Sequence, residues 1–216
     1  LANFQKFFEH PEAINTFVYS IGIAIITTLV CILLGYPAAW ILSNSKLNRS
    51  KTMVVLFILP MWVNILVRTL ATVALFDFFS VPLGEGALIF GMVYNFIPFM
   101  IYPIYNTLQK IDHSYIEAAK DLGAKSYRVF LRVILPLSIP GIISGITMVF
   151  LPSMTNYVVL DMMYNSTYIM GSLVGSYFSM YDWNNGSVIS MILLILILLL
   201  STITGEFSDK EDNAYE

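Results

Sequence analysis

One polar segment between two strongly apolar runs carries residue types and spacing that suit a docking surface. It reads Glu117-Ala118-Ala119-Lys120-Asp121-Leu122-Gly123, and after nine intervening residues comes Val133-Ile134-Leu135-Pro136. Ser114 and Glu117 have the spacing of a capping box, which predicts a helix that begins near Tyr115. Alanines favour the helix and leave a small face for close approach, and Gly123 can adopt the left-handed conformation that ends it.

The residues after Gly123 predict a second short helix. Ser126 is expected to cap it, and an apolar face recurs at helical spacing through Tyr127, Phe130, Leu131 and Ile134. Pro136 and Pro140 are expected to end this helix and open the next apolar segment. Two short helices joined at a glycine form a compact knob that can sit in a cleft of a soluble partner. The alternative is an amphipathic loop whose basic residues meet anionic lipid.

A second set of residues combines aromatic faces with a carboxylate. Trp62, Tyr157, Tyr164 and Asp161 lie at or near the ends of apolar runs. Such groups suit alkylammonium ions, because a cation is attracted both by a ring face and by a carboxylate. The alternative for Asp161 is a carboxylate at a helix end among lipid headgroups. Asp77 and Asp182 are expected to be solvated.

The remaining reactive side chains predict neither catalysis nor a metal site. Cys31 is a single cysteine in an apolar run, and His10 and His113 lack metal-ligand spacing. No nucleophile with a base and no paired aspartates stand within the apolar runs. Arg68 does stand inside one, where a charge is costly, so it is expected to pair with an acid such as Asp77 or to extend outward.

Composition shows what kind of element must position these residues. The chain has 216 residues, of which 57% are hydrophobic and only 12% are charged. Soluble domains are about 25% charged, so the sequence predicts an all-α, polytopic transmembrane protein. Five segments approach the roughly 20 apolar residues that a span needs: 16–42, 53–79, 87–108, 139–160 and 187–204. Pro60, Pro98, Pro103 and Pro152 predict kinks, and residues 168–180 predict a surface loop or a short re-entrant segment.

The distribution of Lys and Arg predicts the orientation. The segments 43–52 and 109–138 are rich in basic residues and are separated by two spans, so both are expected in the cytoplasm. The opposite side is mostly acidic. We therefore expect an external segment at residues 1–12, a transmembrane domain at 13–206 with a polar cytoplasmic loop at 110–136, and an acidic cytoplasmic tail at 207–216. No cleavable signal peptide is recognisable.

The chain resembles type I ABC importer permeases, and within them the spermidine/putrescine permeases of the PotB/PotC type, closest to PotB. Four stretches carry the resemblance: Gly35-Tyr36-Pro37-Ala38-Ala39-Trp40, Leu59–Arg68, Gly91–Met100 and Glu117–Gly141. The resemblance implies that Glu117, Ala118, Ala119, Asp121, Gly123 and Ala124 couple the permease to an ATPase. Such permeases usually have six spans, so the resemblance also implies that a first helix precedes Leu1.

The resemblance further implies a bacterial cytoplasmic-membrane subunit rather than an enzyme. Its implied partners are a second permease subunit, a dimer of ATPase subunits, an external polyamine-binding protein and membrane lipid, with no nucleic acid. No cofactor is expected, because ATP would bind the partner; the sequence itself contains no phosphate-binding loop of the G-x-x-x-x-G-K-[ST] type. The alternative is the same architecture for another small solute: an oxyanion, thiamine or an iron complex.

Overall fold

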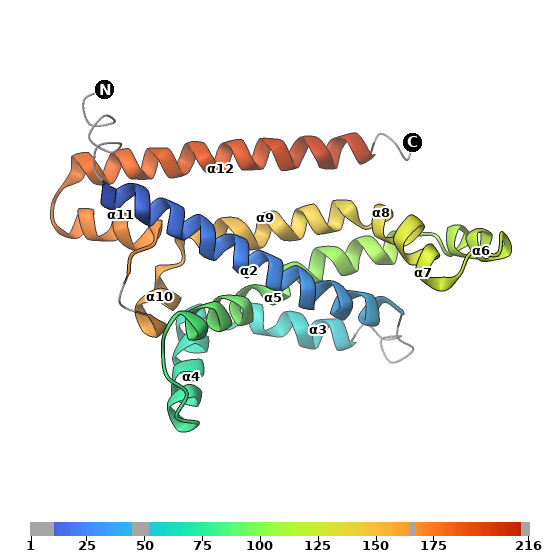
Figure 1. The fold of residues 1–216 in the computed structure, drawn as a ribbon, viewed down its shortest axis with the longest axis horizontal. Coiled ribbons are helices and arrows are strands. Elements are labelled where there is room, and N and C mark those ends of the chain that lie inside the picture. The colour runs from blue at the N-terminus through green and yellow to red at the C-terminus, as the bar shows by residue number, and fades with distance from the viewer. Residues whose placement is uncertain (1–10, 45–51, 165–166, 213–216) are drawn as a thin grey trace.

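The computed structural model describes residues 11–44, 52–164 and 167–212, and every regular element in those ranges is helical. The long helices run along the longest dimension of the molecule (Figure 1). In chain order the elements are α2 (Pro11–Asn44), α3 (Thr52–Ile58), η2 (Leu59–Trp62), α4 (Ile65–Phe78), α5 (Glu85–Lys110), α6 (His113–Asp121), α7 (Ser126–Val129), the π-helix η3 (Phe130–Ile134), α8 (Leu135–Leu137), α9 (Ile139–Thr155), α10 (Tyr157–Met163), α11 (Met170–Ser179) and α12 (Trp183–Asp212).

Helices α2, α5 and α9 pack against one another and form the centre of the bundle. Their buried side chains include Cys31, Leu88, Met92, Met100, Ile104 and Val149. Glycines allow the close approach, because a Cβ atom on Gly141 would lie 2.9 Å from the carbonyl oxygen of Pro103. Small residues at such contacts are typical of helices that associate in lipid. A second cluster joins α11 to α12, with Met170 and Leu173 at its centre.

Two helices are long and apolar enough to cross a membrane singly, Ile14–Asn44 and Glu85–Lys110. The number rises to four if two bent pairs each count as one span. Trp183–Leu199 is a shorter apolar helix within α12. Exposed apolar side chains such as Leu33, which is 72% exposed, lie on the outside of the bundle, as lipid contact requires. The all-α, polytopic prediction is therefore confirmed, with fewer continuous spans than the five expected.

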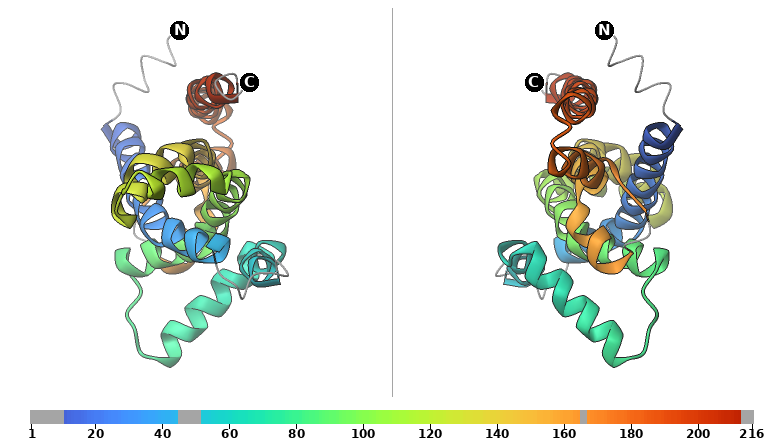
Figure 2. Two further views of the ribbon diagram at one scale, coloured as in Figure 1. Left: turned by 90° about the vertical axis from the view of Figure 1, so that its right-hand side faces the viewer. Right: turned by 90° about the vertical axis from the view of Figure 1, so that its left-hand side faces the viewer.

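The predicted span at 53–79 is interrupted close to Pro60, where a kink was expected, so it is not one continuous helix. Thr52–Trp62 and Ile65–Phe78 meet at 95°, and Val63 between them is extended. Asn64 begins α4 by accepting a 2.8 Å hydrogen bond from the amide of Leu66. Asn64, two residues after the 3₁₀ turn, therefore starts a new helix. The apolar residues on both sides of it make this start hard to recognise in the sequence. Because of the bend, α4 projects away from the bundle (Figure 2).

The predicted span at 139–160 also ends early. Helix α9 stops at Thr155, and α10 begins at Tyr157 after the non-helical Asn156. Pro152 lacks an amide donor and Asn156 is a poor helix former, so the last turn is weak. Residues 168–180 are mostly the helix α11 rather than a loop, and it packs on α12, α9 and α2. Residues 1–10 and 213–216, in the predicted external segment and tail, lie outside the described residues.

Candidate functional site

The predicted knob is present, but its first helix begins earlier than expected. Helix α6 runs from His113, and its N-cap is Asp112, whose carboxylate accepts a 2.9 Å hydrogen bond from the amide of Ser114. The predicted capping box on Ser114 is therefore wrong, because the aspartate two residues upstream occupies the capping position. The backbone amide of Ser114 is the main reason that the pKa of Asp112 lies below its ordinary value.

The end of α6 follows the prediction for Gly123. This glycine has a φ of +78°, in the left-handed region. Its amide donates a 2.8 Å hydrogen bond to the carbonyl of Lys120. The amide of Ala124 donates a 3.1 Å hydrogen bond to the carbonyl of Ala119. This pair of bonds is a Schellman motif, which closes the helix and turns the chain sharply. The sequence pattern thus predicted this corner correctly from one glycine.

The six predicted coupling residues divide into an outer and an inner group. Glu117, Ala118, Asp121 and Gly123 are exposed. Ala119 and Ala124 are half-buried and pack against the main hydrophobic core. Leu122, which we did not single out, is 90% exposed and stands at the corner itself. This apolar side chain is open to contact with a partner, and its place next to Gly123 was the signal in the sequence.

The second half of the knob differs from the predicted helix. Lys125, not Ser126, is the N-cap of α7, and after one turn the chain continues as a π-helix through Phe130–Ile134. The wider turn of a π-helix rotates the side chains relative to an α-helix. Val129 and Ile134 are consequently buried and Phe130 is half-buried, whereas Tyr127 and Leu131 are more than half exposed. The predicted apolar face was therefore only partly correct.

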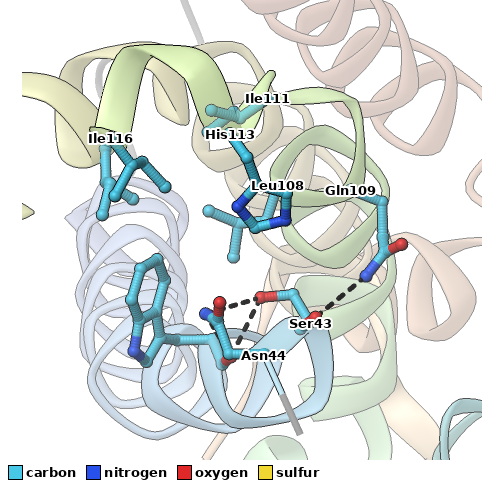
Figure 3. A pocket seen from close by; sticks show the side chains of 9 residues that line it. Ser43, Asn44, Leu108, Gln109, Ile111, His113 and Ile116 are labelled. Carbon is cyan, nitrogen blue, oxygen red and sulfur yellow. Dashed lines mark hydrogen bonds between the residues drawn. The ribbon is translucent and has the colours of Figure 1, made fainter. Parts of the chain in front are cut away.

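A small cavity lies beneath the start of α6, between the C-terminal ends of α2 and α5 (Figure 3). Its volume is about 130 Å³. The amide of Gln109 closes one side by donating a 3.1 Å hydrogen bond to the carbonyl of Ser43. The lining residues are Trp40, Ser43, Asn44, Leu108, Gln109, Ile111, His113, Ile116 and Ile134. The knob thus rests on the membrane helices through a mixed polar and apolar contact with free space inside it.

The predicted substrate residues lie on two separate parts of the fold. Tyr157 and Asp161 stand four residues apart on α10, so both face the same side, and both are exposed. Tyr164 follows α10 directly and is half-buried against the core. Trp62 ends η2 and is 87% exposed. The structure joins three of the four on one short segment and leaves Trp62 on another.

Arg68 is buried but does not pair with Asp77. The two stand nine residues apart on α4, about 13 Å along the helix axis, which is too far for an ion pair. The guanidinium instead lies 3.5 Å from the carbonyl oxygen of Asn95 on α5. The side-chain amide of Asn95 also donates hydrogen bonds to the carbonyl of Gly91 at 2.9 Å and to the hydroxyl of Thr69 at 3.4 Å. This polar cluster attaches α4 to α5. In the described residues no three or more His, Cys, Asp or Glu side chains could hold a metal ion together.

Comparison with known families identifies the class of this fold and site. Residues 31–208 match the model of the binding-protein-dependent transport system inner membrane component. The chain belongs to this family of membrane transport subunits.

Individual relatives narrow the resemblance. The spermidine/putrescine transport system permease protein PotB of Escherichia coli is 33% identical over 93% of this chain and 79% of that protein. PotB of Haemophilus influenzae is 34% identical over 84% of this chain and 70% of that protein. The resemblance to PotB permeases that the sequence suggested is confirmed.

Solved structures agree on the fold. An inward-facing structure of the MetNI methionine ABC transporter superposes with a TM-score of 0.72 at 17% identity, over 91% of this chain and 94% of that chain. A bacterial ABC transporter involved in the import of the acidic polysaccharide alginate gives a TM-score of 0.68 at 12% identity, over 97% and 83% of the two chains. At these identities the likeness concerns the architecture, which is that of an ABC importer permease.

Proposed function

We propose that this chain is the permease subunit of an ATP-driven importer of polyamines such as spermidine and putrescine. Two observations together carry the proposal: the knob, formed by α6 and α7 at residues 112–129, and the 33% identity of the chain to PotB permeases. The family describes transport subunits rather than enzymes. The chain would line the transport pathway together with a second permease subunit.

The knob supports a mechanical link to an ATPase. Its exposed surface is formed by Glu117, Ala118, Asp121 and Leu122, and its corner is fixed by backbone hydrogen bonds. A rigid projection with an apolar tip can occupy a cleft of a soluble subunit and follow that subunit when it moves. For nucleotide to drive the change, the ATPase must bind the two permease conformations with different free energies.

The orientation proposed for the chain places the knob in the cytoplasm. The inner end of α2, the knob and the C-terminal end of α12 lie toward the same end of the molecule (Figure 1). The knob carries Lys120, Lys125 and Arg128, and Lys110 and Arg132 flank it. Basic residues next to spans are retained in the cytoplasm, which supports this orientation.

The opposite end supports a cationic substrate. Tyr157 and Asp161 present a ring and a carboxylate on one exposed face of α10. The one cation among the described membrane residues nearby, Arg68, is buried against Asn95 and turned away from solvent. An oxyanion pathway would need exposed basic groups, so the alternative substrates with negative charge are less well supported.

ATP-driven uptake by proteoliposomes tests the proposal. They would contain the permease, a second permease subunit, the ATPase and the binding protein, with labelled spermidine outside and sulfate or thiamine as competitors. We expect uptake that requires ATP and is displaced by other polyamines only. Uptake displaced by sulfate or thiamine instead would replace the polyamine assignment with one of the alternatives.

Cross-linking tests the ATPase contact separately. Ala118→Cys places a thiol on the exposed face of α6, whereas Ala119→Cys places one on the half-buried face of the same turn. We expect Ala118→Cys to cross-link to the ATPase at several times the yield of Ala119→Cys. Equal yields, or none from Ala118→Cys in an assembled complex, would contradict docking through this face.

A further inference from the structure

The inner end of α2 carries two aromatic side chains whose role the proposed function leaves unexplained. Tyr36 and Trp40 stand four residues apart in the stretch Gly35-Tyr36-Pro37-Ala38-Ala39-Trp40, so they project from one face of the helix. Tyr36 is only 8% exposed, although it lies in a chain that leaves many apolar residues open to lipid. Such burial of one aromatic face at a helix end indicates a specific partner.

The partner is the segment that follows the knob. The ring of Phe130 lies edge-on to both aromatic side chains, at 5.8 Å and 84° from Tyr36 and at 5.6 Å and 83° from Trp40. Both distances fall in the range of favourable aromatic pairs. Phe130 is the first residue of the π-helix η3, so it stands directly after the knob and before α9. One ring is therefore held between two others across elements that are distant in sequence.

A hydrogen bond continues the contact to the bend before α9. The hydroxyl of Tyr36 lies 3.0 Å from that of Ser138, which is completely buried. The Ser138 hydroxyl donates its hydrogen to the carbonyl of Leu135 at 2.8 Å, so the Tyr36 hydroxyl is the donor to Ser138. Ser138 lies where Ser126–Leu137 and Ile139–Thr155 meet at 60°. Tyr36 thus contacts both ends of the connection between the knob and α9.

We propose that Tyr36, Trp40, Phe130 and Ser138 form an aromatic joint that passes movement of the knob to α2. The inference rests on the proposed function, in which an ATPase moves the knob. All four are positioning residues, because they act through helices and not on the transported molecule.

The π-helix is the reason that such a joint is needed. A π-helix holds an extra residue in its turn, and such turns are frequent at functional sites. Without contacts to a neighbouring helix, residues 130–134 would change shape when the knob moves, and the movement would go no further. The rings of Tyr36 and Trp40 on α2 contact Phe130 at the start of the π-helix. The Tyr36 hydroxyl bonds to Ser138, directly before α9. Displacement is thereby transferred to α2.

The surroundings of the joint fit this movement. Trp40 also lines the cavity of about 130 Å³ beneath α6, together with Ile116 and Ile134. Empty space beside a packed contact lets α6 shift without first expelling other side chains. On the other side, Gly35 lies so close to α5 that a Cβ atom would be 3.0 Å from Met100 Cγ. The joint therefore connects the knob to α2, and α2 in turn lies directly against α5.

The test measures labelled spermidine imported per ATP hydrolysed by the reconstituted complex. The variants are Trp40→Leu, Phe130→Leu and the double variant. The matched control is Phe178→Leu, because Phe178 is also half-buried and pairs with Trp183 at 5.4 Å, but between α11 and α12. Wild-type complex is measured first. Failure of ATP-dependent spermidine uptake at that stage would contradict the proposed function and not the joint.

The expected result is a changed ratio, not merely a lower rate. Each single variant should import roughly five- to tenfold less spermidine per ATP, as loss of aromatic pairs predicts. The double variant should be no worse than the poorer single variant, because both rings belong to one unit. Phe178→Leu should keep the wild-type ratio. Trp40→Phe should restore most of the coupling, and Tyr36→Phe, which loses only the bond to Ser138, should lie in between.

Two outcomes would overturn the joint. The first is a parallel loss of uptake and ATP hydrolysis with an unchanged ratio, which is the behaviour of rings that only fill space. The second is a double variant in which the losses of spermidine imported per ATP in the two single variants add. If a leucine variant does not assemble, the ratio is measured on Trp40→Phe and Tyr36→Phe, which keep the aromatic volume. A wild-type ratio in Tyr36→Phe would then reject the proposal, whereas Trp40→Phe is expected to keep most of the coupling and serves as the control.

Discussion

The two ends of this permease differ in how complete a candidate site this single chain forms. In the proposed orientation the end with the knob is the inner end, and the end with α10 is the outer end. At the inner end, the knob has its own cap and its own glycine corner, and Phe130 directly after it contacts two rings of α2. At the outer end, Trp62 and Tyr157 are 87% and 51% exposed, and the carboxylate of Asp161 makes no hydrogen bond within the described part of the chain. A coupling element must be rigid before its partner binds it. A transport pathway between two subunits is completed only by the second one.

The largest effect should follow a change at the glycine corner. Proline fixes φ near −65°, whereas Gly123 has a φ of +78°. Gly123→Pro would also remove the amide that bonds to Lys120. We expect ATP-driven uptake to fall by roughly 100-fold while the protein still inserts, since misplaced proline costs about 3 kcal/mol or more. Glu117→Lys, which reverses a charge on the exposed face, should also uncouple uptake. Uptake and membrane content are measured side by side.

Two alanine variants sharpen this result. Gly123→Ala forces a β-carbon into the left-handed region at a cost of about 1–2 kcal/mol, which predicts a loss of several-fold. Gly175→Ala is the matched control, because Gly175 lies within α11 with open space around its Cα and an ordinary helical conformation. Equal uptake by the two alanine variants would show that the corner does not depend on the conformation of Gly123.

Local backbone chemistry explains what the sequence could predict at the inner end. The left-handed Gly123 and the existence of two short helices followed from residue types within about ten positions. The N-cap was wrong by two residues, because Asp112 and Ser114 are both good caps and only the turn geometry selects between them. The π-helix was not predicted, and the contacts of its first residue, Phe130, are with Tyr36 and Trp40, some 90 positions earlier in the chain, where no local pattern reveals them.

The outer end was harder to predict for a related reason. An apolar run does not reveal where a membrane helix breaks, so Val63 and Asn156 were placed inside spans although both are non-helical. Arg68 could not be assigned to Asn95 from the sequence, because that contact depends on how α4 turns at the 95° bend. Patterns of hydrophobicity describe one helix at a time, and these features arise between helices.

An intermediate effect is expected at α10. Asp161→Asn keeps the shape of the side chain but removes its charge, so the KM for spermidine should rise roughly tenfold or more, as loss of a charge-assisted contact predicts. Asp77→Asn is the matched control, because Asp77 is an exposed carboxylate at the end of α4 and its loss changes the net charge equally. Its KM should change by no more than about twofold, the scale of a general electrostatic effect. Equal changes would mean that only the overall charge attracts the substrate and that α10 does not contact it.

The smallest effect is expected at the cap of α6, where protonation rather than substitution tests the rigidity of the inner end. The amide of Ser114 holds the pKa of Asp112 below its ordinary value, so the capping bond is fully present above the unfolded pKa, about 3.8, and is lost as the pH falls through the lower folded pKa. Asp112→Asn keeps a capping side chain that does not titrate in this range. The difference in thermal midpoint between wild type and Asp112→Asn should therefore stay constant from pH 7 to about pH 4.5 and shift against wild type by no more than about 2 °C below pH 3.8. Measuring the difference between the two proteins cancels the titration of the other carboxylates, and a difference that stays constant down to pH 3 would show that the aspartate does not cap α6 in the folded protein.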